Sequence, residues 1–367
     1  MIWLAFPAAV FILVRLIISL GNLIGAPYLP RGGSEEGSLV SVLIPARNEE
    51  KNLPPLLDGL IRQHYPQLEI LVYDDQSTDG TQQVLERYAR EDPRITWIKG
   101  EGPPPGWNGK NYGCHQLAGR ARGTWFLFLD ADVQVDPSLV GRSLAYARSN
   151  DLTLLSVFPR QLMPTFGERL TVPVMNWILL SMLPMSAIRK SHYPSLSAAN
   201  GQMMLFRARE YRQHRFHLLV REINVEDIHI MRLVKRMGYA ADTLLSRGEI
   251  SCRMYGSYRD AVFGFTRSMF AFFGGSGLAL FLFTLFTTAG VVFMWTGISF
   301  TAAWIYLAAA ALMRLTIHHL SRQPVLRLLL LSPLIQISFV WMVLQSFRMK
   351  IRGTNTWKER VIQFKGI

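Results

Sequence analysis

Long apolar stretches lie near both ends of the chain, and a mixed pattern of short apolar and polar segments fills the middle. The stretch Ile2–Ile24 contains one charge, Arg15. The stretch Ser268–Met313 has no charged residue and no histidine, and Leu328–Phe347 is also uncharged. A helix of about 20 apolar residues crosses the hydrocarbon layer of a membrane. The pattern therefore predicts an N-terminal membrane anchor and about three C-terminal transmembrane helices, with a turn near 290–299.

Arg15 and two prolines indicate how two of the apolar segments are placed in the membrane. Arg15 lies in mid-segment, which favours an uncleaved anchor over a signal peptide, and its side chain either snorkels to the interface or faces a partner helix. The stretch Thr171–Ile188 is uncharged but short, and it contains Pro173 and Pro184. We therefore expect segment 165–190 to lie in the membrane interface.

Between the apolar ends, short strands alternate with helices. This alternation is typical of an α/β fold with a mostly parallel sheet, in which ligands bind beyond the carboxyl ends of the strands. The predicted strands are Leu39–Pro45, Leu68–Tyr73, Ile95–Ile98, Trp125–Leu129, Leu154–Phe158 and Met203–Phe206. The predicted helices among them are Glu50–Gln63, Thr81–Ala89, Lys110–Ala121 and Pro137–Ala147.

These patterns divide the chain into four expected parts. They are an anchor at 1–30, an α/β domain at 38–267, transmembrane helices at 268–347 and a basic tail at 348–367. The linker 314–327 and the tail are both basic, so the positive-inside rule favours the cytoplasm for both. A single span between them cannot satisfy the rule. Either Leu328–Phe347 is re-entrant or the tail lies outside.

Charge and cysteine content narrow the class of protein. The 367 residues include 39 Lys and Arg against 26 Asp and Glu, a net charge of +13. Such a charge suits a nucleic acid or an anionic membrane surface. Because the cationic residues concentrate beside the apolar segments, we expect membrane lipids and no nucleic acid as partners. Two cysteines are too few for a disulfide scaffold or a zinc site.

An acidic pair follows the second predicted strand. Asp74 and Asp75 close Leu68–Tyr73, and an acid at a strand tip can accept a hydrogen bond from a nucleobase or a ribose hydroxyl. The alternative is structural, because Ser77 or Asp79 could cap the next helix. No G-x-G-x-x-G motif follows the first strand, which argues against a dinucleotide-binding unit.

The strongest candidate site follows the strand Trp125–Leu129. Asp130 and Asp132 are two residues apart, so the alternation of side chains places both carboxylates on one side. Two adjacent anions are costly without a cation. The spacing therefore predicts a site for a divalent metal ion, Mg²⁺ or Mn²⁺, and a strand tip entering a capped turn is the alternative.

Two further segments carry candidate functional residues. Gly106–Lys110 places two glycines and a lysine at a predicted helix start, which suits phosphate binding; a solvated loop lysine is the alternative. Asn224–Asp227 opens a helix that runs to about Met237. Asp227 is either the N3 residue of a capping box with Asn224 or a general base facing the same crevice, and the residues alone favour neither.

Taken together, these segments resemble family 2 glycosyltransferases with a GT-A fold. The resemblance rests on Val40–Glu49 (Val-Ser-Val-Leu-Ile-Pro-Ala-Arg-Asn-Glu), followed in order by the Asp74–Asp75 pair, Asp130–Asp132 and the Glu226–Asp227 pair. It implies a Rossmann-like, mostly parallel catalytic sheet combined with N-terminal and C-terminal transmembrane helices.

Other motifs are similar to the membrane-anchored lipid branch of that family. They are Gly106–Lys110, Arg253–Tyr255 and Gly264–Phe265. The branch includes carotenoid (diaponeurosporenoate) and hopanoid-associated glycosyltransferases and, more distantly, ceramide glucosyltransferase. The resemblance covers roughly 38–270 and extends to Trp357–Arg360, where Glu359 replaces the glycine that relatives often have.

The resemblance also implies a role for each candidate residue. Asp227 would be the catalytic base, and Asp132 together with Asp130 would bind the metal. The residues implied to contact the nucleotide sugar are Pro45, Ala46, Asp75, Lys110, Asp130, Arg253 and Arg267, with Asp75 on uracil. The acceptor would meet Asn200, Gly201 and Gln202, and Trp177 in the interfacial segment could open a path for it.

The implied reaction is the inverting transfer of one sugar, with glucose expected, from a UDP-sugar to a membrane lipid. A carotenoid, another terpenoid, a glycerolipid or a sphingolipid would serve as acceptor. Lys110 and the metal would stabilise the departing diphosphate while Asp227 removes the acceptor proton. Because sugar nucleotides are cytoplasmic, we expect a multi-pass cell-membrane protein whose catalytic domain faces the cytoplasm.

Three other classes of protein compete with this interpretation. A processive polysaccharide synthase is the nearest, but the Gln-x-x-Arg-Trp signature is absent and the apolar spans are few for a polymer channel. A membrane-bound nucleotidyltransferase would release pyrophosphate rather than a nucleoside diphosphate. A non-enzymatic scaffold or transporter subunit does not account for four clusters in one crevice.

Overall fold

The structure is a computed structural model that describes residues 2–25, 27–32, 37–352, 356–357 and 360–361. The chain forms two compact units. The sheet unit consists of Pro27–Gln161 and Met185–Arg253; the helical unit consists of Met1–Ala26, Leu162–Pro184 and Met254–Ile367. The division into four parts stays a prediction.

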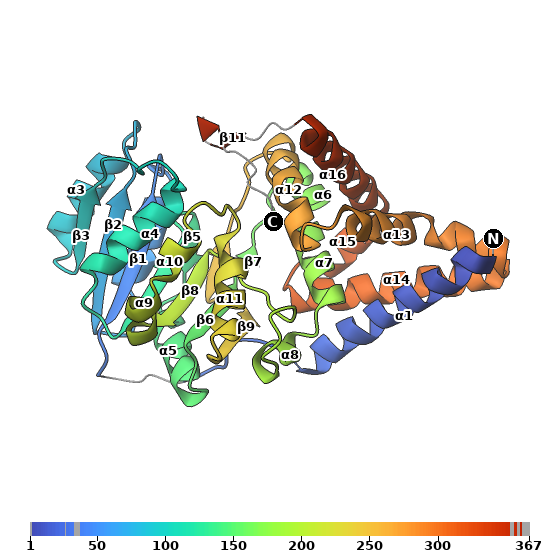
Figure 1. Ribbon diagram of the computed structural model, residues 1–367, viewed down its shortest axis with the longest axis horizontal. Helices are drawn as coiled ribbons and strands as arrows, with labels where there is room; N and C mark the ends of the chain where they lie inside the picture. Colours follow the sequence, from blue (N-terminus) through green and yellow to red (C-terminus); the bar gives the residue numbers. More distant parts are fainter. Residues whose placement is uncertain (1, 26, 33–36, 353–355, 358–359, 362–367) are drawn as a thin grey trace. The chain divides into compact units, whose positions relative to one another are not determined.

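A seven-stranded sheet forms the centre of the sheet unit (Figure 1). Four of its six neighbouring pairs are parallel, and the antiparallel strand β8 lies between β4 and β6. The prediction of a mostly parallel sheet is confirmed. In spatial order the strands are β3 (Ile95–Lys99), β2 (Leu68–Asp74), β1 (Val40–Ala46), β4 (Trp125–Leu129), β8 (Met203–Arg207), β6 (Leu154–Phe158) and β9 (Ala241–Leu245).

The central strands are apolar on both faces because helices cover the sheet. Every residue of β2, β4 and β6 is buried, as expected for strands of a sheet with helices on both sides. The helices of this unit are α2 (Leu53–Ile61), α3 (Thr81–Glu91), α4 (Gly109–Arg120), α5 (Leu139–Ser149), α8 (Met185–Lys190), α9 (Ala208–His214), α10 (Phe216–Leu219) and α11 (Glu226–Arg236).

A smaller three-stranded sheet was not predicted. Its strands, in spatial order, are β5 (Val133–Val135), β10 (Ile250–Cys252) and β7 (Arg160–Gln161). Cys252 pairs with Val133 in the antiparallel register of β10 and β5. This pairing brings Cys252 next to Asp132, 120 positions away in sequence.

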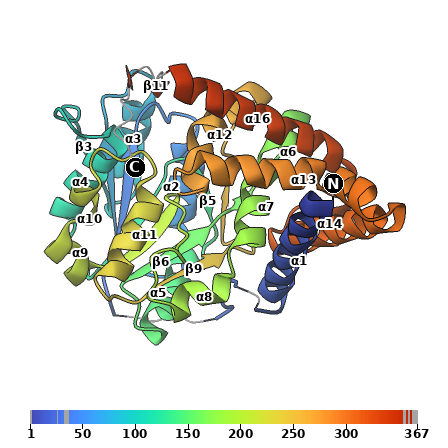
Figure 2. The same cartoon turned by 45° about the vertical axis from the view of Figure 1, so that its right-hand side comes forward.

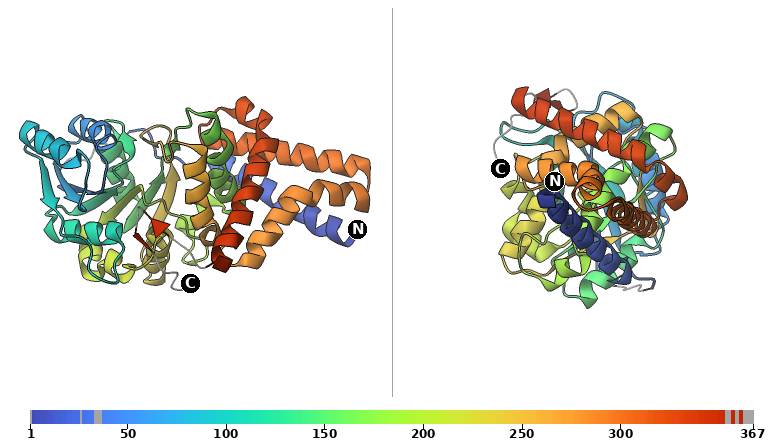
Figure 3. Two further views of the ribbon diagram at one scale, coloured as in Figure 1. Left: turned by 90° about the horizontal axis from the view of Figure 1, so that it is seen from above. Right: turned by 90° about the vertical axis from the view of Figure 1, so that its right-hand side faces the viewer.

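Three helices of the helical unit are long and apolar enough to cross a membrane. They are α1 (Ile2–Gly25), α13 (Gly277–Gly297) and α14 (Phe300–Leu320), and they pack against one another (Figure 3). The turn between α13 and α14 falls at Ile298 and Ser299, inside the predicted range.

The third predicted C-terminal span has a different form. The stretch Leu328–Phe347 divides between α15 (Val325–Leu330) and α16 (Ser332–Arg352). Although α16 has 21 residues, it is not among the three apolar helices of the described chain, since residues such as Gln336 and Gln345 interrupt it. Helix α16 packs along α12 (Tyr258–Phe272) (Figure 2), where the Ser346 hydroxyl donates to the Thr266 carbonyl oxygen at 2.8 Å.

The segment predicted to lie in the interface is divided into short helices. Helices α6 (Phe166–Thr171) and α7 (Pro173–Met182) belong to the helical unit, and α8 follows Pro184. Each is too short to span a membrane. The interfacial location stays a prediction. Two positions of the tail motif at 357–360, 358 and 359, lie outside the described residues. On either side of them, β11 (Thr356–Trp357) pairs with β12 (Arg360–Val361).

Arg15 faces a partner helix, the second of its two predicted environments. Its Nε and Nη2 atoms donate to Ser181 Oγ on α7 at 3.0 and 2.7 Å. Its guanidinium also lies 4.7 Å from the ring centroid of Trp177 and 4.5 Å from that of Phe283. Asn22, two helical turns further on, donates to the Leu180 carbonyl oxygen of the same helix at 2.9 Å.

A buried carboxylate joins two strands of the sheet unit to a neighbouring loop. Glu69 on β2 accepts hydrogen bonds from the Ser41 hydroxyl, from Arg122 Nε at 2.9 Å and from the Gly123 amide at 3.2 Å. Burial alone would raise the pKa of Glu69, but these hydrogen bonds outweigh it and hold the pKa below its ordinary value. The ionised carboxylate therefore stabilises the fold.

We predict that Glu69→Ala lowers the free energy of unfolding by about 1–3 kcal/mol, because it leaves buried donors without an acceptor. Thermal unfolding of the full-length protein in detergent measures the loss. The matched control is Glu91→Ala, since the Glu91 side chain is 57% exposed and forms only a surface pair with Arg87. Equal unfolding temperatures for both variants would contradict the prediction.

Candidate active site

The topology of the sheet brings the candidate residues to one edge. The parallel strands β1, β2 and β4 all end there, and β8 begins there because it runs antiparallel to β4. The loop Asn200–Gln202, which precedes β8, therefore lies beside the end of β4. The Asp130 amide donates to the Gln202 carbonyl oxygen at 3.2 Å and fixes this contact.

Lys110 is the central cation of the edge. Its Nζ atom lies 2.7 Å from Asp130 Oδ1 and 2.9 Å from Glu226 Oε1. The side chain starts from the first turn of α4, where the Asn108 side chain caps the helix by accepting from the Lys110 amide at 3.0 Å. Burial alone would lower the pKa of Lys110, but Asp130 and Glu226 outweigh it and raise the pKa well above its ordinary value. Lys110 is therefore protonated at neutral pH.

Asp227 is oriented by the loop before β8. Its Oδ2 atom accepts a hydrogen bond from the Gly201 amide at 2.9 Å. The capping box is not formed, since α11 has no side-chain cap and Asn224 Oδ1 accepts instead from Asn108 Nδ2 at 2.8 Å. Burial, followed by the repulsion of Glu226, raises the pKa of Asp227 to about 7. Such a carboxylate can exchange a proton near neutral pH.

Position 201 has little room for a side chain, because charged atoms lie close to its backbone. A methyl group at this position would lie 3.0 Å from Glu226 Oε1 and 3.0 Å from Lys110 Nζ. Either the Lys110–Glu226 pair or the loop would have to move. The absence of a side chain at Gly201 therefore lets the loop approach both the ion pair and Asp227.

Asp132 has an unsatisfied oxygen in this site. Its Oδ1 atom is buried and has no hydrogen-bond partner among the described residues. Burial, with repulsion from Asp130 and Glu49, raises the pKa of Asp132 to about 7. On its other side lies Cys252, whose Sγ accepts from Gln202 Nε2 at 2.7 Å. The site thus holds more negative charge than Lys110 balances.

A divalent metal ion fits this surplus of carboxylate oxygens. Asp132 Oδ1 has no protein donor to satisfy it, and carboxylates are the ligands that Mg²⁺ and Mn²⁺ prefer. Asp130 is already paired with Lys110 and is the less available of the two predicted ligands. Within the described part of the chain no three His, Cys, Asp or Glu side chains form a complete metal cage. Ligands from a substrate would have to complete the coordination.

Asp75, Pro45 and Ala46 lie together at the end of β1 and β2. The Asp75 amide donates to the Ala46 carbonyl oxygen at 2.8 Å, and Asp75 is 5% exposed. Arg47 lies 3.9 Å from the Asp75 carboxylate. The start of α3 is satisfied by Asp79, whose Oδ1 accepts from the Thr81 amide at 3.1 Å. Asp75 is therefore not needed as a cap.

Three predicted residues lie outside the group of side chains described above. Arg253 is exposed at the end of the sheet unit. Trp177 and Arg267 belong to the helical unit. Trp177 is 3% exposed and packs against Phe283 and Phe339, with ring centroids 5.3 Å apart in both pairs.

Three residues near the site were given no functional role by the sequence analysis. Glu226 carries a visible signal, because it precedes Asp227 at the start of a helix. Glu49 ends the Val40–Glu49 motif and acts on Asp130 and Asp132 through its charge. Cys252 gives no local signal, since only the pairing of β10 with β5 brings it to Asp132.

Known proteins resemble this chain in sequence and in fold. Residues 41–215 match the model of glycosyl transferase family 2. These residues, just under half of the chain, thus resemble a family 2 glycosyltransferase domain, and the mostly parallel sheet is GT-A-like. The mannosyltransferase PcManGT of Pyrobaculum calidifontis, solved in complex with GDP-Man and Mn²⁺, has a TM-score of 0.57 to this chain at 17% identity. That alignment covers 95% of this chain and 99% of PcManGT and concerns the fold alone.

Curated relatives share part of the chain. The 4,4'-diaponeurosporenoate glycosyltransferase of Staphylococcus haemolyticus is 27% identical over 233 residues, which cover 63% of this chain and 60% of that protein. The protein of the same name from Staphylococcus aureus strain USA300 is 31% identical over 131 residues, or 35% of this chain and 34% of its own length. The chain thus spans less than two thirds of the length of each relative.

Both cysteines should resist alkylation in the folded protein. Burial raises the pKa of Cys252, and the neighbouring Asp132 raises it further; burial also raises the pKa of Cys114 above its ordinary value. A thiol rather than a thiolate is then present at pH 7–8. We expect mass spectrometry to find both unmodified after iodoacetamide treatment at pH 7.5 and both alkylated in denaturant. Rapid native labelling of Cys252 would contradict the packing beside Asp132.

Proposed function

We propose that this protein transfers a single sugar from a nucleotide sugar to a lipid acceptor, with inversion at the anomeric carbon. The observation that carries the proposal is the shared edge of the sheet, where Lys110 joins Asp130 to Glu226 and the Gly201 amide holds Asp227. A partly buried cation beside a partly buried, titratable carboxylate supplies both charges that glycosyl transfer requires. The resemblance to a family 2 glycosyltransferase domain supports the same reaction class.

The donor side of the site would bind a nucleoside diphosphate sugar. Asp75, beside Pro45 and Ala46, would accept from the base, for which we propose uracil. Asp132, with Asp130 beside it, would hold Mg²⁺ or Mn²⁺, which when bound neutralises charge on the diphosphate. Lys110 would add a fixed positive charge as the bond to the sugar breaks. Its pairing with two carboxylates keeps its position fixed before substrate binds.

The acceptor side would be served by Asp227. With a pKa of about 7, its carboxylate can take the proton of an attacking hydroxyl. A general base and a leaving group on opposite faces of the sugar give inversion in one step. Asn200, Gly201 and Gln202 would border the acceptor, and Trp177 of the helical unit would line its path. Arg253 and Arg267 would bind the nucleotide sugar.

A membrane lipid is the proposed acceptor. Three helices that can cross a membrane support this choice, and so does the likeness to proteins named for a carotenoid acid. If only α1, α13 and α14 span, residues 27–276 and everything after α14 lie on one side of the membrane. Both basic segments then face the cytoplasm with the catalytic domain, as the positive-inside rule favours. This arrangement removes the conflict that a third C-terminal span creates.

The proposal predicts a labelled lipid product. Membranes containing the protein, supplied with UDP-[¹⁴C]glucose, a lipid extract and Mn²⁺, should form a lipid that carries one hexose, seen by mass spectrometry, with release of UDP. EDTA or Asp132→Asn should lower the rate at least about a hundredfold. The exposed acid Asp151, changed to Asn, is the control and should leave the rate unchanged.

Other products would contradict this function. A ladder of hexose additions would point to a polysaccharide synthase, and release of pyrophosphate from a nucleoside triphosphate would point to a nucleotidyltransferase. No product with any sugar nucleotide, and no binding of sugar nucleotides with or without Mn²⁺ or Mg²⁺, would overturn the proposal.

The role of Asp227 predicts a pH dependence. For a hydroxyl acceptor the base must be ionised, so kcat/KM should fall about tenfold per pH unit below pH 7 and level off above it. Asp227→Asn should lower kcat by about 10²–10⁴ and abolish this acidic limb, while nucleotide-sugar binding by calorimetry is kept. A carboxylic-acid acceptor is already ionised at pH 6, so with such an acceptor Asp227→Asn would lower kcat by a smaller factor. Full activity of Asp227→Asn on a hydroxyl acceptor contradicts the role.

A further inference from the structure

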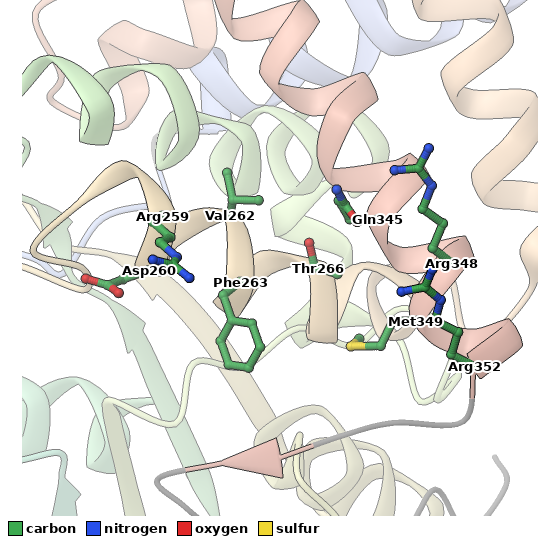
Figure 4. Close-up of a pocket in the computed structure, with 9 residues that line it drawn as sticks. All are labelled: Arg259, Asp260, Val262, Phe263, Thr266, Gln345, Arg348, Met349 and Arg352. Atoms are coloured by element: carbon green, nitrogen blue, oxygen red, sulfur yellow. The ribbon is translucent and has the colours of Figure 1, made fainter.

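A groove lies between α12 and α16 within the helical unit. It has a volume of about 420 Å³ and is lined by residues of these two helices (Figure 4). The helices are held together beside it by the Ser346–Thr266 hydrogen bond and by the rings of Phe270 and Phe347, whose centroids are 5.2 Å apart. The groove is therefore a fixed feature of this helix pair.

The polar lining of the groove is positively charged. Arg348 and Arg352 are one turn apart on α16, and Arg259 lies on α12 (Figure 4). The only acid in the lining, Asp260, accepts from the Ser257 hydroxyl at 2.7 Å at the start of α12. Three cations and one anion leave a surplus of two positive charges. Among the described residues, none of the three arginines forms an ion pair with a carboxylate.

A buried hydroxyl in the lining also has no partner. Thr266 is 6% exposed, and its Oγ1 atom accepts or donates no hydrogen bond within the described chain. Its side chain lies between the two helices, as does that of Gln345 on the facing helix (Figure 4). Buried hydroxyls are normally satisfied, so an unsatisfied one in a groove that arginines also line indicates a place for a polar ligand.

Apolar side chains form the rest of the wall. Val262, Phe263 and Met349 line the groove, and Phe263 is 50% exposed. The ligand should therefore carry an anionic group next to an apolar part. A phosphate group is the anion that several arginines and a hydroxyl bind best together.

We infer that this groove binds the phosphate of an anionic phospholipid headgroup. Arg348 and Arg352 on α16 would attract the phosphate from one wall of the groove and Arg259 on α12 from the other. Thr266, between the helices, would donate to a phosphate oxygen, and Phe263 would contact the glycerol and the start of an acyl chain. The three apolar helices of the same unit would bring the groove to a bilayer that contains such lipids. The inference rests on the helical unit alone and does not depend on the proposed sugar transfer.

Lipid binding to the full-length protein tests the inference. In neutral detergent, native mass spectrometry would compare bound phosphatidylglycerol with bound phosphatidylcholine. Wild type should prefer phosphatidylglycerol. Each of Arg348→Gln and Arg352→Gln should weaken its binding about fivefold, as expected for one charge at a lipid phosphate. Thr266→Val, which keeps the shape of the side chain, should weaken binding without removing a charge.

Lys350→Gln is the matched control. Lys350 lies on the same helix between the two arginines, but it stacks over Phe270 at 4.3 Å and does not line the groove. We expect a change of less than about twofold. Equal losses for Lys350→Gln and the arginine variants would overturn the inference, because the lipid would then respond to net charge only. Equal binding of both lipids would also overturn it, as would displacement of phosphatidylglycerol by inorganic phosphate at equal concentration.

Discussion

The electrostatic balance around Lys110 is the constraint on which the candidate site depends. One ammonium stands among several carboxylates at a buried edge of the sheet, and it pairs directly with Asp130 and Glu226. Removing it would leave these anions facing one another in a poorly solvated place, where repulsion is strong. The pKa values of Asp132 and Asp227 rise mainly because of burial and further because of the neighbouring carboxylates that Lys110 does not neutralise. The site is thus prepared for a further cation and for a mobile proton.

The reversed direction of β8 makes this balance possible. A sheet of parallel strands alone would leave the end of β4 open, whereas β8 brings its preceding loop back to the same edge. Through Gly201 that loop contacts both the Lys110 pair and Asp227. A cation from α4, an acid from α11 and two acids after β4 are therefore fixed by one short turn.

The sequence predicts the parts of this arrangement that are local. The buried run of β4 and the spacing of Asp130 and Asp132 are visible without a structure, because strand alternation acts over a few residues. Strand β9 cannot be predicted in this way, since Asp242 interrupts its apolar run. Burial of Asp242 is stabilised by Tyr146, whose hydroxyl donates to it at 2.6 Å and comes from a distant helix. The position of Cys252 also depends on a distant pairing. Whether Asp227 caps a helix or faces the site is decided by Gly201, which no local pattern reveals.

Arg15 has a consequence for how the protein is made. In the finished molecule its guanidinium is held by Ser181 and by aromatic rings of other helices. During synthesis the first helix leaves the ribosome long before Ser181 exists. The nascent segment must then carry an uncompensated charge in the translocation machinery or in lipid. On insertion scales this charge costs about 2.5–3.5 kcal/mol, which the other apolar residues of α1 outweigh, and Arg15 gains its partners once α7 and α13 have joined α1. An anchor helix without an arginine would leave Ser181 of α7 without this polar contact.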